Sequence, residues 1–79
     1  MRATVLVRPK EGILDPQGQA VGSSLRQLGF AVADASVGRV VDIELEATDP
    51  ATARAEVERM CRQLLANPLI ESYEIELVE

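Results

Sequence analysis

An Asp-Pro pair occurs twice in the chain, at Asp15–Pro16 and again thirty-four positions later at Asp49–Pro50. This pair is typical of a helix start. The carboxylate can cap free backbone N–H groups, and a proline at the first helical position loses no hydrogen bond. A strand-like stretch comes before each pair and a helix-like stretch after it. The repeat therefore predicts two similar halves, each built from strands and one helix.

Strand patterns flank both predicted helices. The clearest two-residue alternation runs through 39–47, where apolar residues at odd positions alternate with Asp42, Glu44 and Glu46. Residues 3–9 and 70–78 alternate in the same way, which predicts strands with one buried face. The stretch FAVADASV, residues 30–37, is predicted to be a further strand, and Gly38 to mark the turn into 39–47.

Each predicted helix carries an apolar stripe. The first stripe contains Ala20, Val21, Leu25 and Leu28, and Gly29 follows where a left-handed C-terminal residue belongs. In the second helix, Asn67–Pro68 ends the stripe, which contains Ala53, Val57, Met60, Cys61, Leu64 and Leu65.

The order β-α-β-β-α-β predicts an α+β fold for a single domain, residues 1–79. We expect a two-layer sandwich whose antiparallel sheet has both helices on one face, in the ferredoxin-like manner. The other sheet face is left open. Because so short a chain buries only about 60% of its unfolded surface, we expect a homo-oligomer, a dimer or a tetramer.

Charge and composition argue against several classes of protein. The net charge is −5 and Lys10 is the only lysine. One Phe and one Tyr are the only aromatic residues on which nucleic-acid bases could stack. We therefore expect no nucleic-acid binding. The apolar runs are far too short for a membrane span or a signal peptide, so the expected location is cytoplasmic.

The residues needed for common catalytic sites are missing. The chain has no histidine and a single cysteine, Cys61, so it cannot assemble a Cys–His pair, a zinc cluster or a Ser–His–Asp triad. Cys61 lies on the apolar stripe and is predicted to be a packing residue. We expect no catalytic residue, no cofactor and no metal in this chain.

Two glycines in the first helix, Gly18 and Gly22, raise the question of what needs their missing side chains. A helical glycine costs roughly 0.5–1 kcal/mol relative to alanine. Either the helix packs closely on a strand of the same subunit, or a partner protein approaches it. On the second view a leucine at Gly18 leaves the chain folded and weakens assembly. The candidate contact residues are Lys10, Gly12, Asp15, Pro16, Gln17 and Gly18.

Several stretches together resemble the PurS subunits of phosphoribosylformylglycinamidine synthase. They are LDPQG at 14–18, VGRVVDIELE at 37–46, and LANP at 65–68 followed by Ile70 and Glu71. The resemblance covers nearly the whole chain, and the order and spacing of the stretches carry it.

This resemblance implies a role in a three-component glutamine amidotransferase of purine biosynthesis. A glutaminase subunit, PurQ, releases ammonia, and an ATP-dependent synthetase subunit, PurL, transfers it to formylglycinamide ribonucleotide. The complex uses ATP, Mg and glutamine. The small subunit carries no chemistry and bridges its two partners.

Two other classes of protein have a similar size and element order. A small regulatory module of similar topology could bind an amino acid or nucleotide between subunits, with Lys10, Asp15 and Gln17 as polar groups. An enzyme of acylphosphatase size would need a phosphate-binding arginine loop after the first strand. The loop here is Pro9-Lys10-Glu11-Gly12, which argues against that enzyme.

Overall fold

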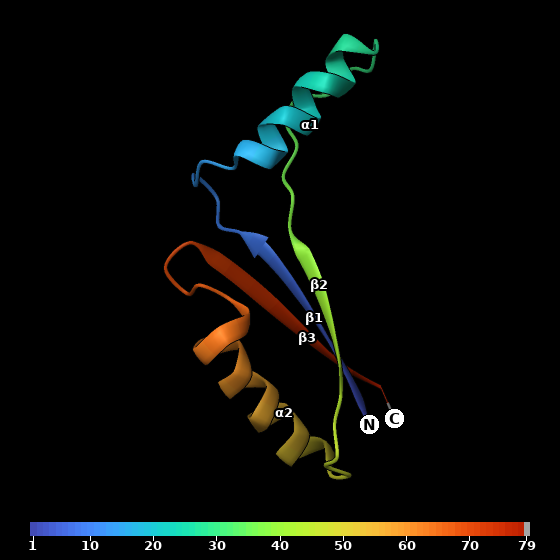
Figure 1. Ribbon diagram of the computed structural model, residues 1–79, viewed down its shortest axis with the longest axis vertical. Coiled ribbons are helices and arrows are strands. Elements are labelled where there is room, and N and C mark those ends of the chain that lie inside the picture. The colour runs from blue at the N-terminus through green and yellow to red at the C-terminus, as the bar shows by residue number, and fades with distance from the viewer. Residues whose placement is uncertain (79) are drawn as a thin grey trace.

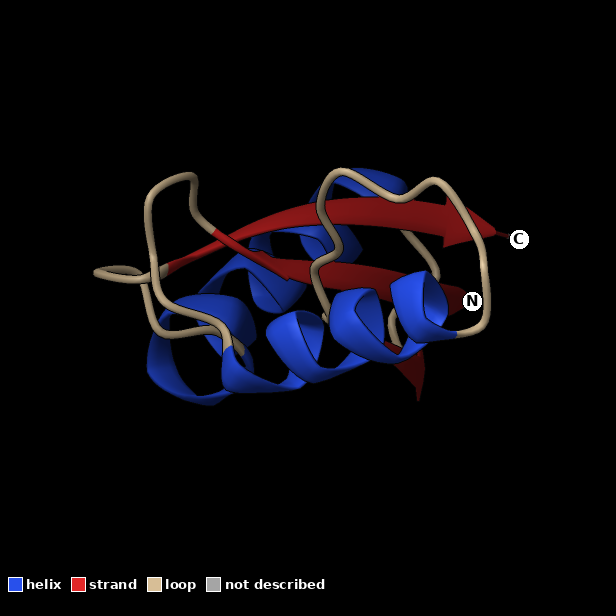
Figure 2. Cartoon of the chain, turned by 90° about the horizontal axis from the view of Figure 1, so that it is seen from above, coloured by secondary structure: helices blue, strands red, loops and turns tan. Residues whose placement is uncertain are grey.

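The three strands form one antiparallel sheet in the order β2-β1-β3, so the N-terminal strand is central (Figure 1). The computed structural model describes residues 1–78. Its elements are β1 (Arg2–Pro9), α1 (Pro16–Gln27), β2 (Arg39–Glu44), α2 (Pro50–Met60), the π-helix η1 (Cys61–Leu65) and β3 (Glu71–Val78). The predicted α+β class is confirmed. Arg2 and Val78 pair with each other at the end of the sheet farthest from α1 (Figure 1), and Figure 2 shows the same sheet from above.

The core lies between one face of the sheet and the continuous helix α2–η1. Strand β1 alternates as predicted: Ala3, Val5 and Val7 are buried on the helix side, and the residues between them face the open side. On that open face, Thr4 Oγ1 donates to Asp42 Oδ1 at 2.7 Å. The remaining buried apolar residues are Leu45, Ala53, Val57, Cys61 and Ala66.

Helix α1 and the segment after it form an arm, residues 16–38, that points away from the sheet (Figure 1). Every core residue of the described chain lies outside this arm. The molecule measures 48 × 25 × 14 Å and its radius of gyration is 15.7 Å. A compact domain of this length would have a radius of gyration of about 12 Å. The single chain is therefore elongated, with the arm supported only at its base.

The predicted strand at 30–37 and the placement of both helices on one sheet face are wrong for the single chain. Residues 30–37 return along α1 with a bend at Ala33, and they join no sheet within the described residues. The reason lies at Gly38, which is not left-handed as a tight hairpin turn would require. A Cβ at Gly38 would meet the Val7 carbonyl oxygen. The glycine thus allows β1 to pass closely, and the chain runs straight from the arm into β2.

Both Asp-Pro pairs begin helices, as predicted. The Asp49 carboxylate accepts a hydrogen bond from Thr52 N at 2.9 Å and caps α2. At the other end of α1, Gly29 has φ +97, which confirms the predicted left-handed residue. No helix within residues 1–78 is long and apolar enough to cross a membrane.

The second helix ends in a wider turn than predicted. Ala66 N donates to Cys61 O at 3.0 Å, five residues back, which is the pattern of a π-helix. Leu64 was predicted to lie on the apolar stripe, but in this turn it is 83% exposed. Ala66 is already extended, so the predicted stop at Asn67–Pro68 is confirmed.

We expect the Cys61 thiol to be inert and replaceable. Cys61 is fully buried, and burial raises the pKa of its thiol. Cys61→Ala should lower the free energy of unfolding by about 1–2 kcal/mol, through a small cavity. Urea titration measures this loss, and iodoacetamide labelling of the native protein should be far slower than labelling of the unfolded chain. Fast labelling of the native protein would contradict the packing role.

Candidate functional site

Three loops meet at the end of the sheet from which the arm leaves, and we call them the loop cluster. They are the β1–α1 loop (10–15), the junction of the arm with β2 (37–39) and the α2–β3 turn (66–70). Lys10 joins the first loop to the third. Its backbone N donates to Ile70 O at 2.8 Å, and its Nζ donates to the Pro68 carbonyl oxygen at 2.6 Å.

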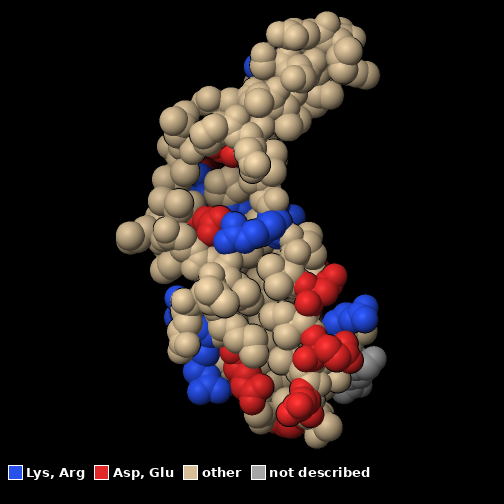
Figure 3. All heavy atoms as spheres, viewed as in Figure 1, with Lys and Arg blue, Asp and Glu red and all other residues tan. Residues whose placement is uncertain are grey.

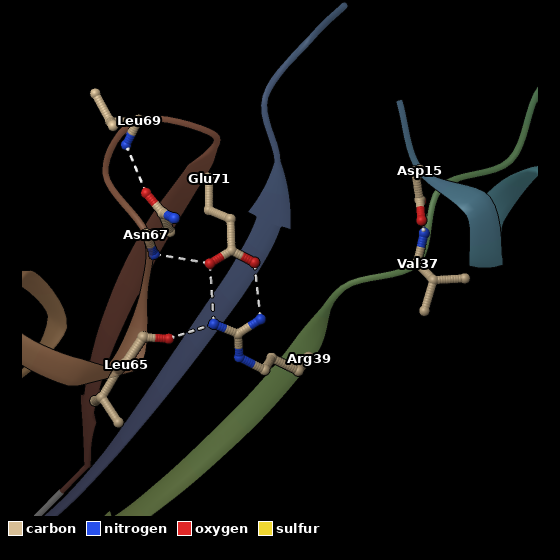
Figure 4. Close-up of polar contacts among 7 residues, drawn as sticks. All are labelled: Asp15, Val37, Arg39, Leu65, Asn67, Leu69 and Glu71. Atoms are coloured by element: carbon tan, nitrogen blue, oxygen red, sulfur yellow. Dashed lines mark hydrogen bonds and ion pairs between the residues drawn. The ribbon is translucent and has the colours of Figure 1, made fainter. Parts of the chain in front are cut away.

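Arg39 joins the start of β2 to the α2–β3 turn (Figure 4). Its guanidinium donates to both oxygens of Glu71, at 2.7 and 3.0 Å, and Nη2 also donates to Leu65 O at 2.6 Å. Glu71 Oε1 accepts a further bond from Asn67 N at 2.8 Å. A bidentate charged pair of this kind fixes direction as well as distance. The bond from Arg39, and then that from Asn67 N, lower the pKa of Glu71.

Asp15 ties the start of α1 to the end of the arm. Its Oδ2 accepts a hydrogen bond from Val37 N at 2.8 Å (Figure 4). The predicted side-chain cap on α1 is therefore wrong in detail, since Asp15 occupies the N-cap position without a side-chain cap bond. The hydrogen bond from the Val37 N–H is the main cause that lowers the pKa of Asp15.

The two glycines of α1 lie against the arm's own extended segment. A Cβ at Gly18 would be 2.5 Å from Ala35 O and 2.8 Å from Ser36 Cα. At Gly22 a Cβ would be 3.4 Å from Arg26 Nη1 and 3.5 Å from Ala35 Cβ. Close packing within the subunit is thus confirmed for Gly18. Backbone atoms occupy the space that a leucine at Gly18 would need, so α1 would have to move off this segment. That the sheet of such a variant stays folded remains a prediction.

The structure brings all six candidate contact residues to the loop cluster and the base of the arm. One hollow of about 330 Å³ is lined by Lys10, Gly12, Asp15 and residues 34–36. A second, of about 250 Å³, is lined by Asp15, Pro16 and Gln17 on one side and by Arg39 and Glu71 on the other. Gly12, Pro16 and Gln17 are exposed, Asp15 is half-buried and Gly18 is buried.

Sequence reasoning missed the pair of Arg39 and Glu71, which are separated by 32 positions. Both charges stand near the starts of predicted strands, but nothing in the sequence indicates that these two charges pair. It also missed the apolar side chains that the loops expose, Leu14 at 72% and Leu69 at 82%. The polar groups of the cluster bond to one another, so what remains for a partner is a fixed, partly apolar surface.

The bonded state of Lys10 and Asp15 bears on the regulatory-module alternative. That alternative needs the ammonium and the carboxylate to be free for a small ligand. Both groups instead hold loops of this chain together, at 2.6 and 2.8 Å. A ligand that used them would have to share them with these loop contacts.

We expect the loop cluster to weaken in acid. The folded pKa of Glu71 lies below its ordinary value of 4.5. The unfolded state therefore takes up the proton first as the pH falls. The stabilisation from Glu71 is complete above pH 4.5 and is lost as the pH falls through the folded value. The pKa values of Asp15 and Asp49 are also lowered, from 3.8, and steepen the loss.

Urea midpoints between pH 3 and 7 test this expectation. Glu71→Gln should have a lower midpoint at neutral pH and a shallower decline in acid. Glu76→Gln, which changes an exposed carboxylate on the open sheet face, is the matched control. Parallel acid declines for Glu71→Gln and the unchanged chain would contradict the role of Glu71.

Comparisons with known proteins agree with one another. The chain matches the family model PurS, described as phosphoribosylformylglycinamidine (FGAM) synthase, over residues 2–79. It is 46% identical over 77 residues to the phosphoribosylformylglycinamidine synthase subunit PurS of Synechocystis sp., which covers 96% of this chain and 75% of that protein.

Solved structures give the same result. PurS from Methanocaldococcus jannaschii is one of the subunits of formylglycinamide ribonucleotide amidotransferase in the purine biosynthetic pathway. Its crystal structure matches this chain with a TM-score of 0.82 and 38% identity, over 99% of this chain and 98% of that one. A chain of PurLQS from Thermotoga maritima matches with a TM-score of 0.85 and 29% identity, over 95% and 93%.

Proposed function

This chain belongs to the PurS family of phosphoribosylformylglycinamidine synthase subunits, and we propose that it acts in that ligase as a bridge without chemistry of its own. One observation carries the proposal. The loop cluster uses its charged groups to hold its own shape, and it exposes Leu14 beside Gln17 in the β1–α1 loop and Leu69 in the α2–β3 turn. A rigid, partly apolar surface of this kind suits docking to a protein rather than binding or activating a small substrate.

The partners we propose are the glutaminase subunit PurQ and the synthetase subunit PurL. The similarity to a chain of PurLQS from Thermotoga maritima supports this assignment. In such a complex, ATP, Mg and glutamine bind to the partners, and the bridge keeps the site that releases ammonia close to the site that uses it. We propose a cytoplasmic location, in keeping with this biosynthetic role.

The proposed contact combines shape with exposed groups. Gly12, Pro16 and Gln17 present the outer surface of the β1–α1 loop and the first turn of α1. Three other residues set the position of that surface. Lys10 donates to the α2–β3 turn, Asp15 accepts from Val37 N at the end of the arm, and Gly18 packs against residues 35–36.

Leu14→Asp tests this surface. An aspartate at the centre of an apolar contact must be desolvated, so we expect assembly with the two partner subunits to weaken by about tenfold or more. Glutamine-dependent synthesis should fall more than ammonia-dependent synthesis, because only the former needs the glutaminase. Both rates are measured with purified partner subunits, and the chain alone should have neither glutaminase nor ATPase activity.

Val78→Asp is the matched control, since Val78 is also exposed but lies at the C-terminal end of β3, away from the loop cluster. It should leave both rates unchanged. Equal loss of the two rates in Leu14→Asp, or an effect as large in Val78→Asp, would place the contact elsewhere.

We also propose that the chain is a homo-oligomer. The elongated shape and the isolated arm support self-association. A chain of 79 residues has too small a core to bury the arm as well as the inner face of the sheet. The four-stranded ferredoxin-like arrangement belongs to this oligomer rather than to one chain.

A further inference from the structure

The α2–β3 turn exposes apolar side chains and carries no charge. Residues 66–70 are Ala, Asn, Pro, Leu and Ile, and Leu69 is 82% exposed. Leu64, in the π-helix just before the turn, is 83% exposed. The turn lies at the left in Figure 1, and Figure 3 shows an uncharged bulge there. Absence of charge together with exposed apolar side chains is typical of the centre of a protein interface.

Every backbone N–H of this turn donates a hydrogen bond. Those of Asn67 and Leu69 donate to side chains, to Glu71 Oε1 at 2.8 Å and to Asn67 Oδ1 at 3.1 Å. Those of Ala66 and Ile70 donate to backbone oxygens at 3.0 and 3.1 Å. A segment whose backbone groups are all bonded opens less readily than a free loop. The turn therefore holds Leu69 in one direction, with its side chain pointing away from Glu71 (Figure 4).

Arg39 reaches this turn from a different strand and holds both of its ends. Its Nη2 donates to Leu65 O, the last carbonyl of η1, at 2.6 Å. The last carbonyls of a helix have no partner within the helix, so this bond supplies one from outside. At the other end, the guanidinium holds Glu71 by two bonds, and Glu71 Oε1 also accepts from Asn67 N. The path of the chain from η1 into the turn thus depends on Arg39, directly and through Glu71.

We propose that Arg39 is a positioning residue for docking. Through Leu65 O and Glu71 it holds the α2–β3 turn in the conformation that presents Leu69 to an apolar pocket of a partner subunit in the ligase. A turn fixed before binding loses less conformational entropy when it docks, which raises the affinity. The inference rests on the proposed bridging function, and it names the residue that controls one part of the bridging surface.

A double-mutant cycle between positions 39 and 69 tests this role. Lysine keeps the charge of Arg39, but its ammonium cannot hold two carboxylate oxygens and a carbonyl in one fixed geometry. Assembly with purified PurL and PurQ is titrated for the unchanged chain, Arg39→Lys, Leu69→Ala and the double variant. We expect each single change to weaken assembly by about tenfold, and the double variant to be little weaker than either, because Leu69 contributes only while its turn is fixed. Losses that multiply to about 100-fold would overturn the proposal.

Arg2→Lys is the matched control. Arg2 is also an exposed arginine of a strand that faces a carboxylate on the neighbouring strand, Glu44. Its contact is a single one of 3.6 Å, and it lies at the end of the sheet away from the loop cluster. Arg2→Lys should assemble like the unchanged chain, and Leu69→Ala should cost the full tenfold when the two changes are combined.

The conformation of the turn is measured on the chain without its partners. The NMR order parameter of the Leu69 N–H should be about 0.85 in the unchanged chain and in Arg2→Lys, as in rigid backbone, and below about 0.6 in Arg39→Lys. A residue that only stabilised the fold would lower the urea midpoint without loosening this turn in the native state. A rigid Leu69 N–H in Arg39→Lys would therefore overturn the positioning role.

The bridging role and the positioning role can fail separately. If Leu14→Asp weakens assembly while the changes at positions 39 and 69 act independently, the bridge stands and the positioning role of Arg39 is wrong. If Leu14→Asp leaves assembly intact, the β1–α1 loop is not the contact, whereas coupling between positions 39 and 69 would still support the role of Arg39.

Discussion

Gly18→Ala should separate α1 from the segment 30–37 that it packs on, while leaving the sheet folded. A single methyl group at this position would lie 2.5 Å from the Ala35 carbonyl oxygen and 2.8 Å from Ser36 Cα. Both are backbone atoms, so no side chain can turn aside to make room, and the helix must move off the segment. Overpacking of this kind typically costs about 1–3 kcal/mol. Here the cost falls on the arm, since the core contains no arm residue.

The expected result is therefore loss of self-association and of glutamine-dependent synthesis, with the far-ultraviolet signature of the sheet retained. Gly22→Ala is the matched control: the same change on the same face of α1, one turn later. Its Cβ would lie 3.5 Å from Ala35 Cβ, an ordinary contact, and alanine favours the helix by about 1 kcal/mol. If Gly18→Ala and Gly22→Ala self-associate equally well, the close packing at Gly18 is not needed for self-association.

The sheet could be predicted because its pattern is local. In β1 and β2 the alternation of apolar and charged residues decides which face meets α2, and the structure has Val5 and Val41 on that side. The Asp-Pro pairs predicted both helix starts for the same reason, since a cap acts within four residues. Signals of this kind can be found without knowing which elements pack against one another.

Segment 30–37 shows where local pattern reaches its limit. Its sequence favours a strand, but the segment bends at Ala33 and pairs with no strand of the described chain. Whether an extended segment is a strand depends on a neighbour, which one copy of the chain does not supply. The turn predicted at Gly38 is wrong for a related reason. A glycine can serve a left-handed turn or a close approach, and only the position of Val7 decides between them.

The candidate site divides in the same way. Lys10 to Gly18 are contiguous, so any fold keeps them together, and recognising one of them finds the rest. Arg39 and Glu71 meet only because β2 and β3 both flank β1 and start at the same end of the sheet. The sequence pattern placed both residues correctly in strands but held no signal of which charges pair.

Gly38→Ala is expected to destabilise the sheet as well as the arm, and by more than any other single methyl group discussed above. A Cβ at this position would meet the Val7 carbonyl oxygen, with Val7 C at 3.2 Å and Arg8 Cα at 3.3 Å. All three atoms belong to the backbone of the central strand. To make room, β2 must separate from β1 at its first residues, which also pulls Arg39 away from Glu71. We expect a loss of about 3 kcal/mol in the free energy of unfolding.

The sign of the change separates this account from the simpler one. If Gly38 were only a flexible link, alanine would restrict the unfolded chain and stabilise the protein by about 0.4–1 kcal/mol. Urea denaturation of Gly38→Ala beside Gly22→Ala measures the difference between two identical chemical changes. Hydrogen exchange then locates it, since faster exchange in β2 with unchanged exchange in β3 is expected from a gap that opens between β1 and β2. A stabilised Gly38→Ala variant would show that the straight path into β2 needs no glycine, and the reason for the arm's direction would then have to lie in the Asp15 and Arg39 bonds alone.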